Sequence, residues 1–246
     1  MTDFHVIIPA RYASQRLPGK MLLDIAGKPM IQRVYECALS SEALSVTVAT
    51  DDKRIADAVS SFGGSYCMTS EQHASGTDRI AEAVDNLSLG NDEMVVNLQG
   101  DEPQMPGKLI KQVAQGLAQH PDTSIATACE MIDTQDEFTD RSVVKVVRDK
   151  NDYALYFSRA PIPTRREQGG NSQLDAYRHI GLYAYRAGYV KEFTELEPVP
   201  LELIERLEQL RALWHGHKIH VSEAVQSAGI GIDTQEGLEK IRLQYK

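Results

Sequence analysis

Residues able to hold phosphate groups follow the first predicted strand of the chain. Arg11, Arg16 and Lys20 lie in the loop PARYASQRLPGK, together with Gly19. Three cations and the backbone amides around a glycine are suited to binding a triphosphate. The loop is not a Walker A motif, because Met21 follows Lys20 where that motif has serine or threonine. A solvated basic surface loop is the competing interpretation.

An acidic pair could bind a divalent metal ion. Asp101 lies in QGDEP, directly after the apolar segment MVVNL, and Gly100 lets a ligand approach the backbone closely. Magnesium commonly takes one or two carboxylates and completes its shell with water and phosphate oxygens. Asp233 is the candidate second ligand, but its spacing from Glu236 is also that of a helix capping box. From spacing alone, the capping role is favoured.

Further polar residues open a predicted helix in the segment SGTDR. Ser75 and Gly76 begin it and Arg79 follows one turn later. A helix N-terminus favours anionic ligand groups, so a binding role is one interpretation. A simple cap formed by Ser75 and Asp78 is the other. His73, just before this segment, could contact a ligand, although a loop histidine is more often structural.

Several residues of the second half suit an acidic ligand. Arg159, Arg178 and His179 lie at the ends of predicted strands, and a guanidinium matches a carboxylate in shape and charge. Glu208 and Gln209 lie on the polar side of a predicted helix. A hydrated surface is the competing interpretation for all five.

The elements that must position these residues alternate along the first half of the chain. Strands are predicted at 4–8, 45–50, 65–68 and 94–98, and helices at 29–38, 52–61, 77–87 and 108–119. Such alternation indicates right-handed βαβ units in a mainly parallel sheet. Ligands of open α/β sheets bind beyond the carboxyl ends of the strands, where these segments should converge. Pro9 is expected to end the first strand, because proline cannot donate to a ladder.

The second half has a different pattern. Strands are predicted at 124–131, 143–148, 153–157, 178–185 and 218–222, with helices at 201–214 and 234–245. This suggests antiparallel additions to the sheet or a small second sheet that pairs subunits. The polar residues 164–176 are expected to form a mobile loop. In the absence of a linker or repeat, we expect a single α/β domain over 1–246, with an embellishment at about 124–195.

Composition narrows the class of protein. The 246-residue chain has a formal net charge of -9, which argues against a nucleic-acid partner because binding to phosphates needs a basic face. A membrane span is not expected, because no run of about 18 apolar residues occurs. The three scattered cysteines indicate reduced thiols in a cytoplasmic protein.

Eight ordered segments resemble those of the CMP-Kdo synthetase (3-deoxy-manno-octulosonate cytidylyltransferase) family. They are IPARYASQRLPGK, KPMIQRVYECA, VATDD, SGTDR, NLQGDEP, YALYFSRAPIP, RHIGLYAY and LEQLRALW. The resemblance implies a Rossmann-like α/β nucleotidyltransferase fold: a mixed, mainly parallel sheet flanked by helices, with a small antiparallel dimerisation element. It also implies a homodimer that uses CTP, a Kdo-type sugar acid and the cofactor Mg²⁺.

The resemblance assigns roles that spacing alone left open. Asp101 and Asp233 would bind magnesium, which reverses the capping preference for Asp233, and Lys20 and Arg11 would act with them in catalysis. The nucleotide would contact Ala10, Arg11, Arg16, Lys20, Thr50, Ser75, Gly76 and Arg79. The sugar acid would contact Gln99, Arg159, His179, Glu208 and Gln209, and residues 124–195 would carry the sugar-binding and dimerisation embellishment.

One position departs from the family pattern. Met21 stands where a proline is expected, which affects the rigidity of the loop but leaves Lys20 in place. The implied reaction is attack of the sugar's anomeric hydroxyl on the α-phosphorus of CTP, for bacterial lipopolysaccharide synthesis. Alternatives are the same reaction on 8-amino-Kdo or a sialic acid, and a non-catalytic nucleotide-binding module. A metal-dependent glycosyltransferase is disfavoured, because the post-strand segment QGDEP lacks D-x-D.

Overall fold

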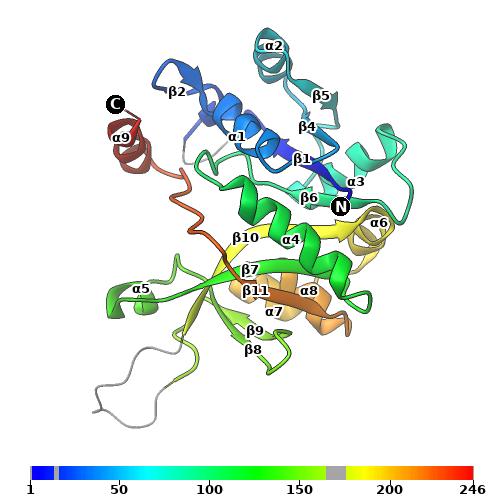
Figure 1. Cartoon of the computed structure of the whole chain (residues 1–246), viewed down its shortest axis with the longest axis vertical. Helices are drawn as coiled ribbons and strands as arrows, with labels where there is room; N and C mark the ends of the chain where they lie inside the picture. The colour runs from blue at the N-terminus through cyan, green and yellow to red at the C-terminus, as the bar shows by residue number, and fades with distance from the viewer. Residues whose placement is uncertain (1, 14–16, 165–175, 246) are drawn as a thin grey trace.

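A mixed, twisted sheet forms the centre of the molecule (Figure 1), which is a computed structural model describing residues 2–13, 17–164 and 176–245. Within these ranges the sheet has nine strands and the main order β11-β7-β10-β6-β1-β4-β5, with β8 and β9 attached through β10. The strands are β1 (His5–Ala10), β4 (Ser45–Thr50), β5 (Ser65–Met68), β6 (Met94–Asn97), β7 (Ile125–Met131), β8 (Lys145–Arg148), β9 (Ala154–Ser158), β10 (Tyr177–Arg186) and β11 (Ile219–Glu223). A separate hairpin pairs β2 (Asp24–Ile25) with β3 (Lys28–Pro29).

Helices cover both faces of this sheet. They are α1 (Met30–Leu39), α2 (Lys53–Ser61), α3 (Gly76–Asn86), α4 (Gly107–Gln119), α5 (Gln135–Thr139), α6 (Ala187–Glu195), α7 (Pro200–Glu205), α8 (Gln209–Trp214) and α9 (Gln235–Gln244), with a 3₁₀ turn at Lys20–Leu22. None of the helices in the described ranges is long and apolar enough to cross a membrane.

Strand directions confirm the predicted change between the two halves. β1 pairs in parallel with β4 and β6, and β4 with β5, as βαβ units require. β10 runs antiparallel to both β6 and β7, and the β8–β9 hairpin is antiparallel as well. The fold is therefore the predicted Rossmann-like one, with its antiparallel additions joined to the main sheet.

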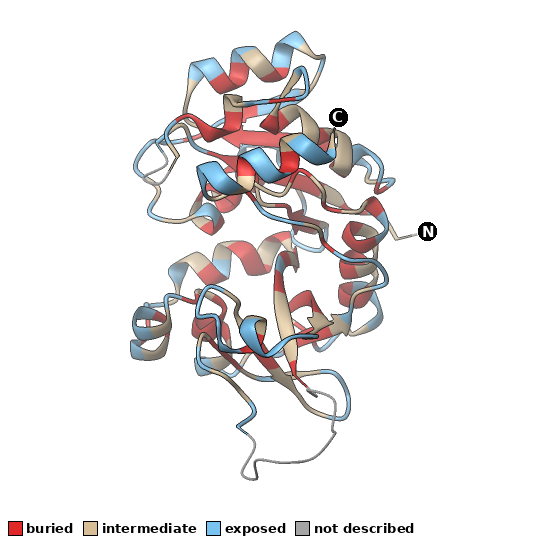
Figure 2. Ribbon diagram, turned by 90° about the vertical axis from the view of Figure 1, so that its left-hand side faces the viewer, coloured by how far each residue is buried: buried red, intermediate tan, exposed pale blue. Residues whose placement is uncertain are grey.

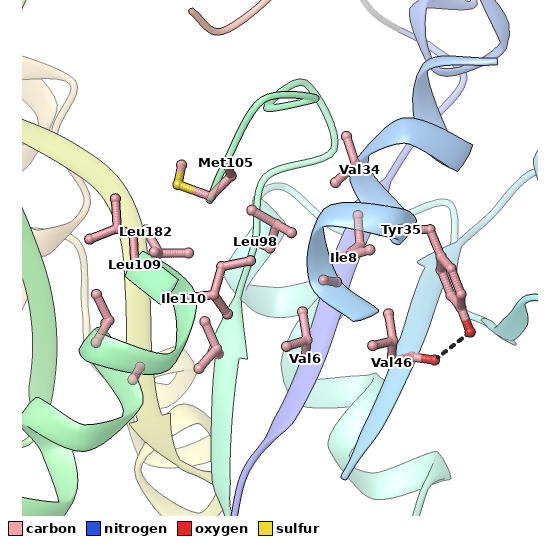
Figure 3. Packing of buried hydrophobic residues seen from close by; sticks show 14 of the residues in the cluster. Val6, Ile8, Val34, Tyr35, Val46, Leu98, Met105, Leu109, Ile110 and Leu182 are labelled. Carbon is pink, nitrogen blue, oxygen red and sulfur yellow. Dashed lines mark hydrogen bonds between the residues drawn. The ribbon is translucent and has the colours of Figure 1, made fainter. Parts of the chain in front are cut away.

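Alternate residues of β1 supply the two layers of the core. Val6 and Ile8 pack with α1, α2 and α4 on one face, and Ile7 packs with α3 and α6 on the other. Buried residues line the strands and the inward faces of the helices (Figure 2). Figure 3 shows the first layer, in which the hydroxyl of Tyr35 donates to the Val46 carbonyl at 3.2 Å. Burying each large apolar side chain contributes about 1.5–3 kcal/mol to the stability of the folded state.

Two sequence predictions about the elements were wrong. β1 does not stop before Pro9 but continues to Ala10, with Pro9 opposite Ala49 of β4. Pairing with β6 ends at Ile7, so proline lies where β1 has a neighbour on one side only. The helix predicted at 201–214 is two helices, because Arg206 adopts a left-handed conformation (φ 54°) that ends α7.

Three elements had no clear sequence signal: α5, α6 and the β2–β3 hairpin. The hairpin matters for the site, because α9 packs beside it (Figure 1). Ile25, Met30, Ile232, Leu238 and Ile241 form a small apolar cluster at this contact. The carboxyl-terminal segment thereby returns from β11 to the neighbourhood of β1.

Arg16 and most of the loop predicted at 164–176 lie outside the described residues.

Candidate active site

A cavity of about 520 Å³ lies beyond the carboxyl ends of β1 and β6. The segments that follow β1, β5 and β6 meet there, as the rule for open α/β sheets predicts. The cavity is lined by Pro9, Ala10, Arg11, Lys20, Met21, His73, Ala74, Ser75, Gly76, Arg79, Gln99, Gly100, Asp101 and Asp233.

Lys20 connects the two predicted metal ligands. Its Nζ donates to Asp101 Oδ2 at 2.5 Å and to Asp233 Oδ1 at 3.1 Å. The backbones are also joined, because the Ile232 N–H donates to the Asp101 carbonyl at 2.8 Å. The capping role considered for Asp233 belongs instead to Thr234, whose hydroxyl accepts from Gly237 N at 3.1 Å. The two carboxylates therefore share one cation.

The loop that carries Lys20 has a defined turn. Gly19 adopts φ 67°, a left-handed conformation that favours glycine, and its N–H donates to Tyr12 O at 3.1 Å. Met21, which stands in place of the expected proline, is buried against Gly100. A Cβ on Gly100 would lie 2.8 Å from the sulfur of Met21 and 3.0 Å from the carbonyl oxygen of Pro9. Only glycine lets these segments approach so closely.

Glu102 is a neighbour that the sequence analysis did not select. Burial, together with the negative charges of Asp101 and Asp233, raises its pKa to about 8. It packs against Gly231, where a Cβ would lie 2.8 Å from Glu102 Oε1. Its position next to Asp101 in QGDEP was the available signal. Glu102 is not among the residues that line the cavity, so the carboxylates that face a cation there are those of Asp101 and Asp233.

The N-terminus of α3 combines the two roles that were considered for it. Ser75 Oγ accepts from Asp78 N at 3.1 Å, and Asp78 Oδ2 accepts from Ser75 N at 3.0 Å, which confirms the capping box. Ser75 and Gly76 also line the cavity, so the positive end of the helix dipole faces it.

Arg79 lines the same cavity, and two hydrogen bonds fix the position of its guanidinium. Its guanidinium donates to Asp51 Oδ2 at 2.6 Å and to Thr69 Oγ1 at 2.5 Å. Asp51, in the segment VATDD, therefore supports Arg79. Thr50 does not line the cavity; it is buried, and its hydroxyl accepts from Asp52 N at 3.3 Å. His73 does line it, with Nε2 in contact with Glu82.

A second, smaller cavity of about 160 Å³ adjoins the first, because Gly76 and Gln99 line both. It is lined by Gly76, Thr77, Asn97, Gln99, Ile125, Tyr183, Tyr185, Phe193, Glu208 and Gln209. Three of the predicted sugar-binding residues, Gln99, Glu208 and Gln209, are thus brought together. The aromatic side chains of β10 and α6 were not selected from the sequence, although Tyr183 and Tyr185 belong to the segment RHIGLYAY.

Glu208 connects the wall of the smaller cavity to the N-terminus of α3. Its Oε2 accepts from the hydroxyl of Thr77 at 2.6 Å, at the first turn of α3. Burial raises the pKa of Glu208, and the hydrogen bonds from Thr77 and Ser75 oppose that rise. Its carboxyl group is therefore a partly buried acceptor that lines the smaller cavity.

The remaining predicted residues lie outside both cavities. The guanidinium of Arg159 donates to backbone carbonyls, from Nε to Glu205 O at 2.7 Å and from Nη1 to Arg141 O at 3.1 Å. Arg178 Nε donates to Glu130 Oε2 at 2.8 Å. His179 lies behind the wall of the smaller cavity, with its ring centroid 5.3 Å from that of Tyr183. In this structure His179 supports the wall through Tyr183, whereas Arg159 is held by backbone carbonyls outside the cavity.

This architecture, with cations and carboxylates at the ends of parallel strands, is that of a nucleotidyltransferase. A cytidylyltransferase structure from Leptospira borgpetersenii, 16% identical, has the same fold with a TM-score of 0.61, covering 98% of this chain and 85% of that one. The cytidylyltransferase family model matches residues 5–219. The chain belongs to this family, and within it to the 3-deoxy-manno-octulosonate cytidylyltransferases.

The relatives that support this assignment match over almost their whole length. The protein named 3-deoxy-manno-octulosonate cytidylyltransferase from Hahella chejuensis is 52% identical, covering 98% of this chain and 97% of that protein. The one from Idiomarina loihiensis is also 52% identical with the same coverage. A solved CMP:2-keto-3-deoxy-manno-octonic acid synthetase complexed with CTP superposes with a TM-score of 0.91 at 42% identity, covering 99% of this chain and 98% of that one.

Proposed function

We propose that this chain transfers CMP from CTP to 3-deoxy-manno-octulosonate (Kdo) and releases pyrophosphate. The observation that carries the proposal is the junction of the two cavities. Lys20, Asp101 and Asp233 line the larger cavity, and Gln99 and Gly76 line both. A nucleotide in the larger cavity and a sugar acid in the smaller one would therefore meet beside this charged group. The names of the full-length relatives support the same pair of substrates.

The chain's own residues would bind and orient the triphosphate. Arg11, Lys20 and Arg79 line the larger cavity, and the N-terminus of α3 faces it. Their positive charges and the helix dipole offset the charge that develops on the phosphates during transfer. Holding the two substrates in line also lowers the activation barrier, since proximity alone can supply several kcal/mol.

The residues present also fit a magnesium ion. Asp101 and Asp233 already share one cation, the ammonium of Lys20, and hard carboxylate oxygens are the ligands that magnesium prefers. Among the described residues, no group of three or more such side chains is arranged as a metal cage. Magnesium commonly takes one or two carboxylates and completes its shell with water and phosphate oxygens. When bound, it would neutralise phosphate charge and lower the pKa of the attacking hydroxyl.

No covalent intermediate is needed in this reaction. The anomeric hydroxyl of the sugar loses its proton to solvent as its oxygen forms a bond to the α-phosphorus of CTP, and the bond from that phosphorus to the pyrophosphate oxygen breaks. Gln99, Glu208 and Gln209 would orient the sugar acid, since all three line the smaller cavity. Its aromatic wall, Tyr183, Tyr185 and Phe193, would exclude water from the attacking face.

The direct test is pyrophosphate release from CTP and Kdo, with and without magnesium. Kdo should support turnover, and 8-amino-Kdo and a sialic acid should be poor substrates, since the relatives' names favour Kdo. ATP in place of CTP serves as the nucleotide control. Tight CTP binding without pyrophosphate release from any of the three sugar acids would replace the enzyme proposal by a nucleotide-binding module.

We further propose a homodimer. Apolar side chains are exposed on β9 and α7: Leu155 is 61% exposed, Leu203 55% and Ile204 77%. These elements are neighbours, because Ser158 Oγ donates to Glu205 Oε1 at 2.6 Å. Exposed large apolar residues on adjoining elements are typical of an interface.

A further inference from the structure

A buried ion pair lies next to the smaller cavity without lining it. Arg211 Nε donates to Glu202 Oε2 at 2.8 Å, and Arg211 Nη2 donates to Glu202 Oε1 at 2.5 Å. Both side chains are only 11% exposed. The paired hydrogen bonds fix the plane of the guanidinium relative to the carboxylate, which a single contact would not do.

This pair joins three consecutive helices. Arg211 belongs to α8 and Glu202 to α7, and the guanidinium carbon lies 4.9 Å from the ring centroid of Phe193 on α6. Arg211 Nη1 also donates to Leu196 O, at 3.3 Å, in the turn between α6 and α7. One guanidinium therefore contacts every segment from α6 to α8.

The same three-helix segment forms one wall of the smaller cavity. Phe193 comes from α6, and Glu208 and Gln209 precede Arg211 by one turn or less. None of them lines the larger cavity. A change in the contacts of Arg211 should therefore move the wall of the smaller cavity and leave the larger cavity in place.

Stability alone does not explain a charged pair at this position. Replacing a buried ion pair by apolar residues of similar volume is often neutral or stabilising, because both charges lose hydration on burial. What apolar residues cannot supply is the fixed geometry of paired hydrogen bonds. The break between α7 and α8 at Arg206 makes such a constraint useful, since no continuous helix connects the two.

We propose that Arg211, oriented by Glu202, is a positioning residue that sets the affinity of the smaller cavity for the sugar acid. This inference rests on the proposed function. The pair holds Phe193, Glu208 and Gln209 in the geometry that the sugar acid requires and has no direct contact with either substrate. A displacement of the wall by about 1 Å is enough to weaken positioning by one to two orders of magnitude.

The test uses Arg211→Lys and the apolar double variant Glu202→Leu/Arg211→Met in the full chain. For both, the KM for Kdo should rise at least about tenfold, while the KM and Kd for CTP stay within about twofold of the wild-type values. The double variant should keep a thermal midpoint near that of the wild type. Arg148→Lys is the matched control, because the Arg148 side chain is also 11% exposed and pairs with Asp152, away from both cavities.

Each outcome decides between the interpretations. An unchanged KM for Kdo in the folded double variant would overturn the positioning role. An equal rise in the KM for CTP, or the same rise in Arg148→Lys, would show a general structural effect and would also overturn it. If the wild-type protein releases no pyrophosphate from CTP with any sugar acid, the proposed function itself fails and the inference with it.

Discussion

His179 should make the protein sensitive to acid, and the structure gives both the direction and the size of the effect. Burial lowers the pKa of His179 from 6.5 to about 3. The hydrogen bonds explain which tautomer of the neutral ring is held. Thr127 Oγ1 lies 2.7 Å from Leu182 O, a carbonyl that can only accept, so the hydroxyl donates there. Its oxygen then accepts from Nε2–H of His179 at 3.0 Å.

Because its pKa lies near 3, His179 is a neutral imidazole in the folded chain at neutral pH. Between pH values of about 3 and 6.5 the unfolded chain binds a proton at this residue and the folded chain does not. Stability is present above the unfolded pKa and is lost as the pH falls below it. At about pH 5 the loss is roughly 1.5 pH units at about 1.4 kcal/mol each, or about 2 kcal/mol relative to neutral pH.

The measurement is urea unfolding of the wild type and His179→Gln at about pH 7.5 and pH 5. Glutamine keeps an amide donor near the position of Nε2 but does not titrate, so the variant should lose about 2 kcal/mol less than the wild type. His220, whose pKa burial also lowers, contributes equally to both proteins and cancels. The exposed His215, changed to Gln, is the control. Equal losses in the wild type and His179→Gln would refute the reasoning.

Three further predictions concern the larger cavity and the assembly. Asp101→Asn should abolish detectable Mn²⁺ binding in the presence of CTP and reduce turnover by at least about two orders of magnitude, whereas Asp122→Asn, at an exposed pair, should change neither. Gly100→Ala should cost about 1–3 kcal/mol in urea unfolding and raise the KM for CTP, because the added methyl group meets Met21; unchanged values would contradict the close contact. Sedimentation should give a dimer mass for the wild type and a monomer mass for Ile204→Glu, and a wild-type monomer would exclude the proposed homodimer.

Local patterns were sufficient to predict most of the elements. β5 lies at the predicted residues Ser65–Met68, and α2 and α4 differ from prediction by one residue at their start. These segments have apolar residues at strand or helix spacing, bounded by turns. The same reasoning predicted one helix where the structure has α7 and α8. The apolar spacing runs through Arg206 and gives no sign of its left-handed backbone. It also missed Glu102, since burial of a charged residue is decided by what packs over it.

The sequence by itself determined the parallel core, the segments that follow its strands and the types of residue they carry, because these depend on spacing within one element. Only the tertiary structure decided which distant residues meet. Asp233 reaches Lys20 because α9 packs on the β2–β3 hairpin and Ile232 bonds to the backbone of Asp101. Local spacing suggested a cap at that position, and the structure gives that cap to Thr234. Such contacts depend on packing between elements far apart in the chain, which no local pattern records.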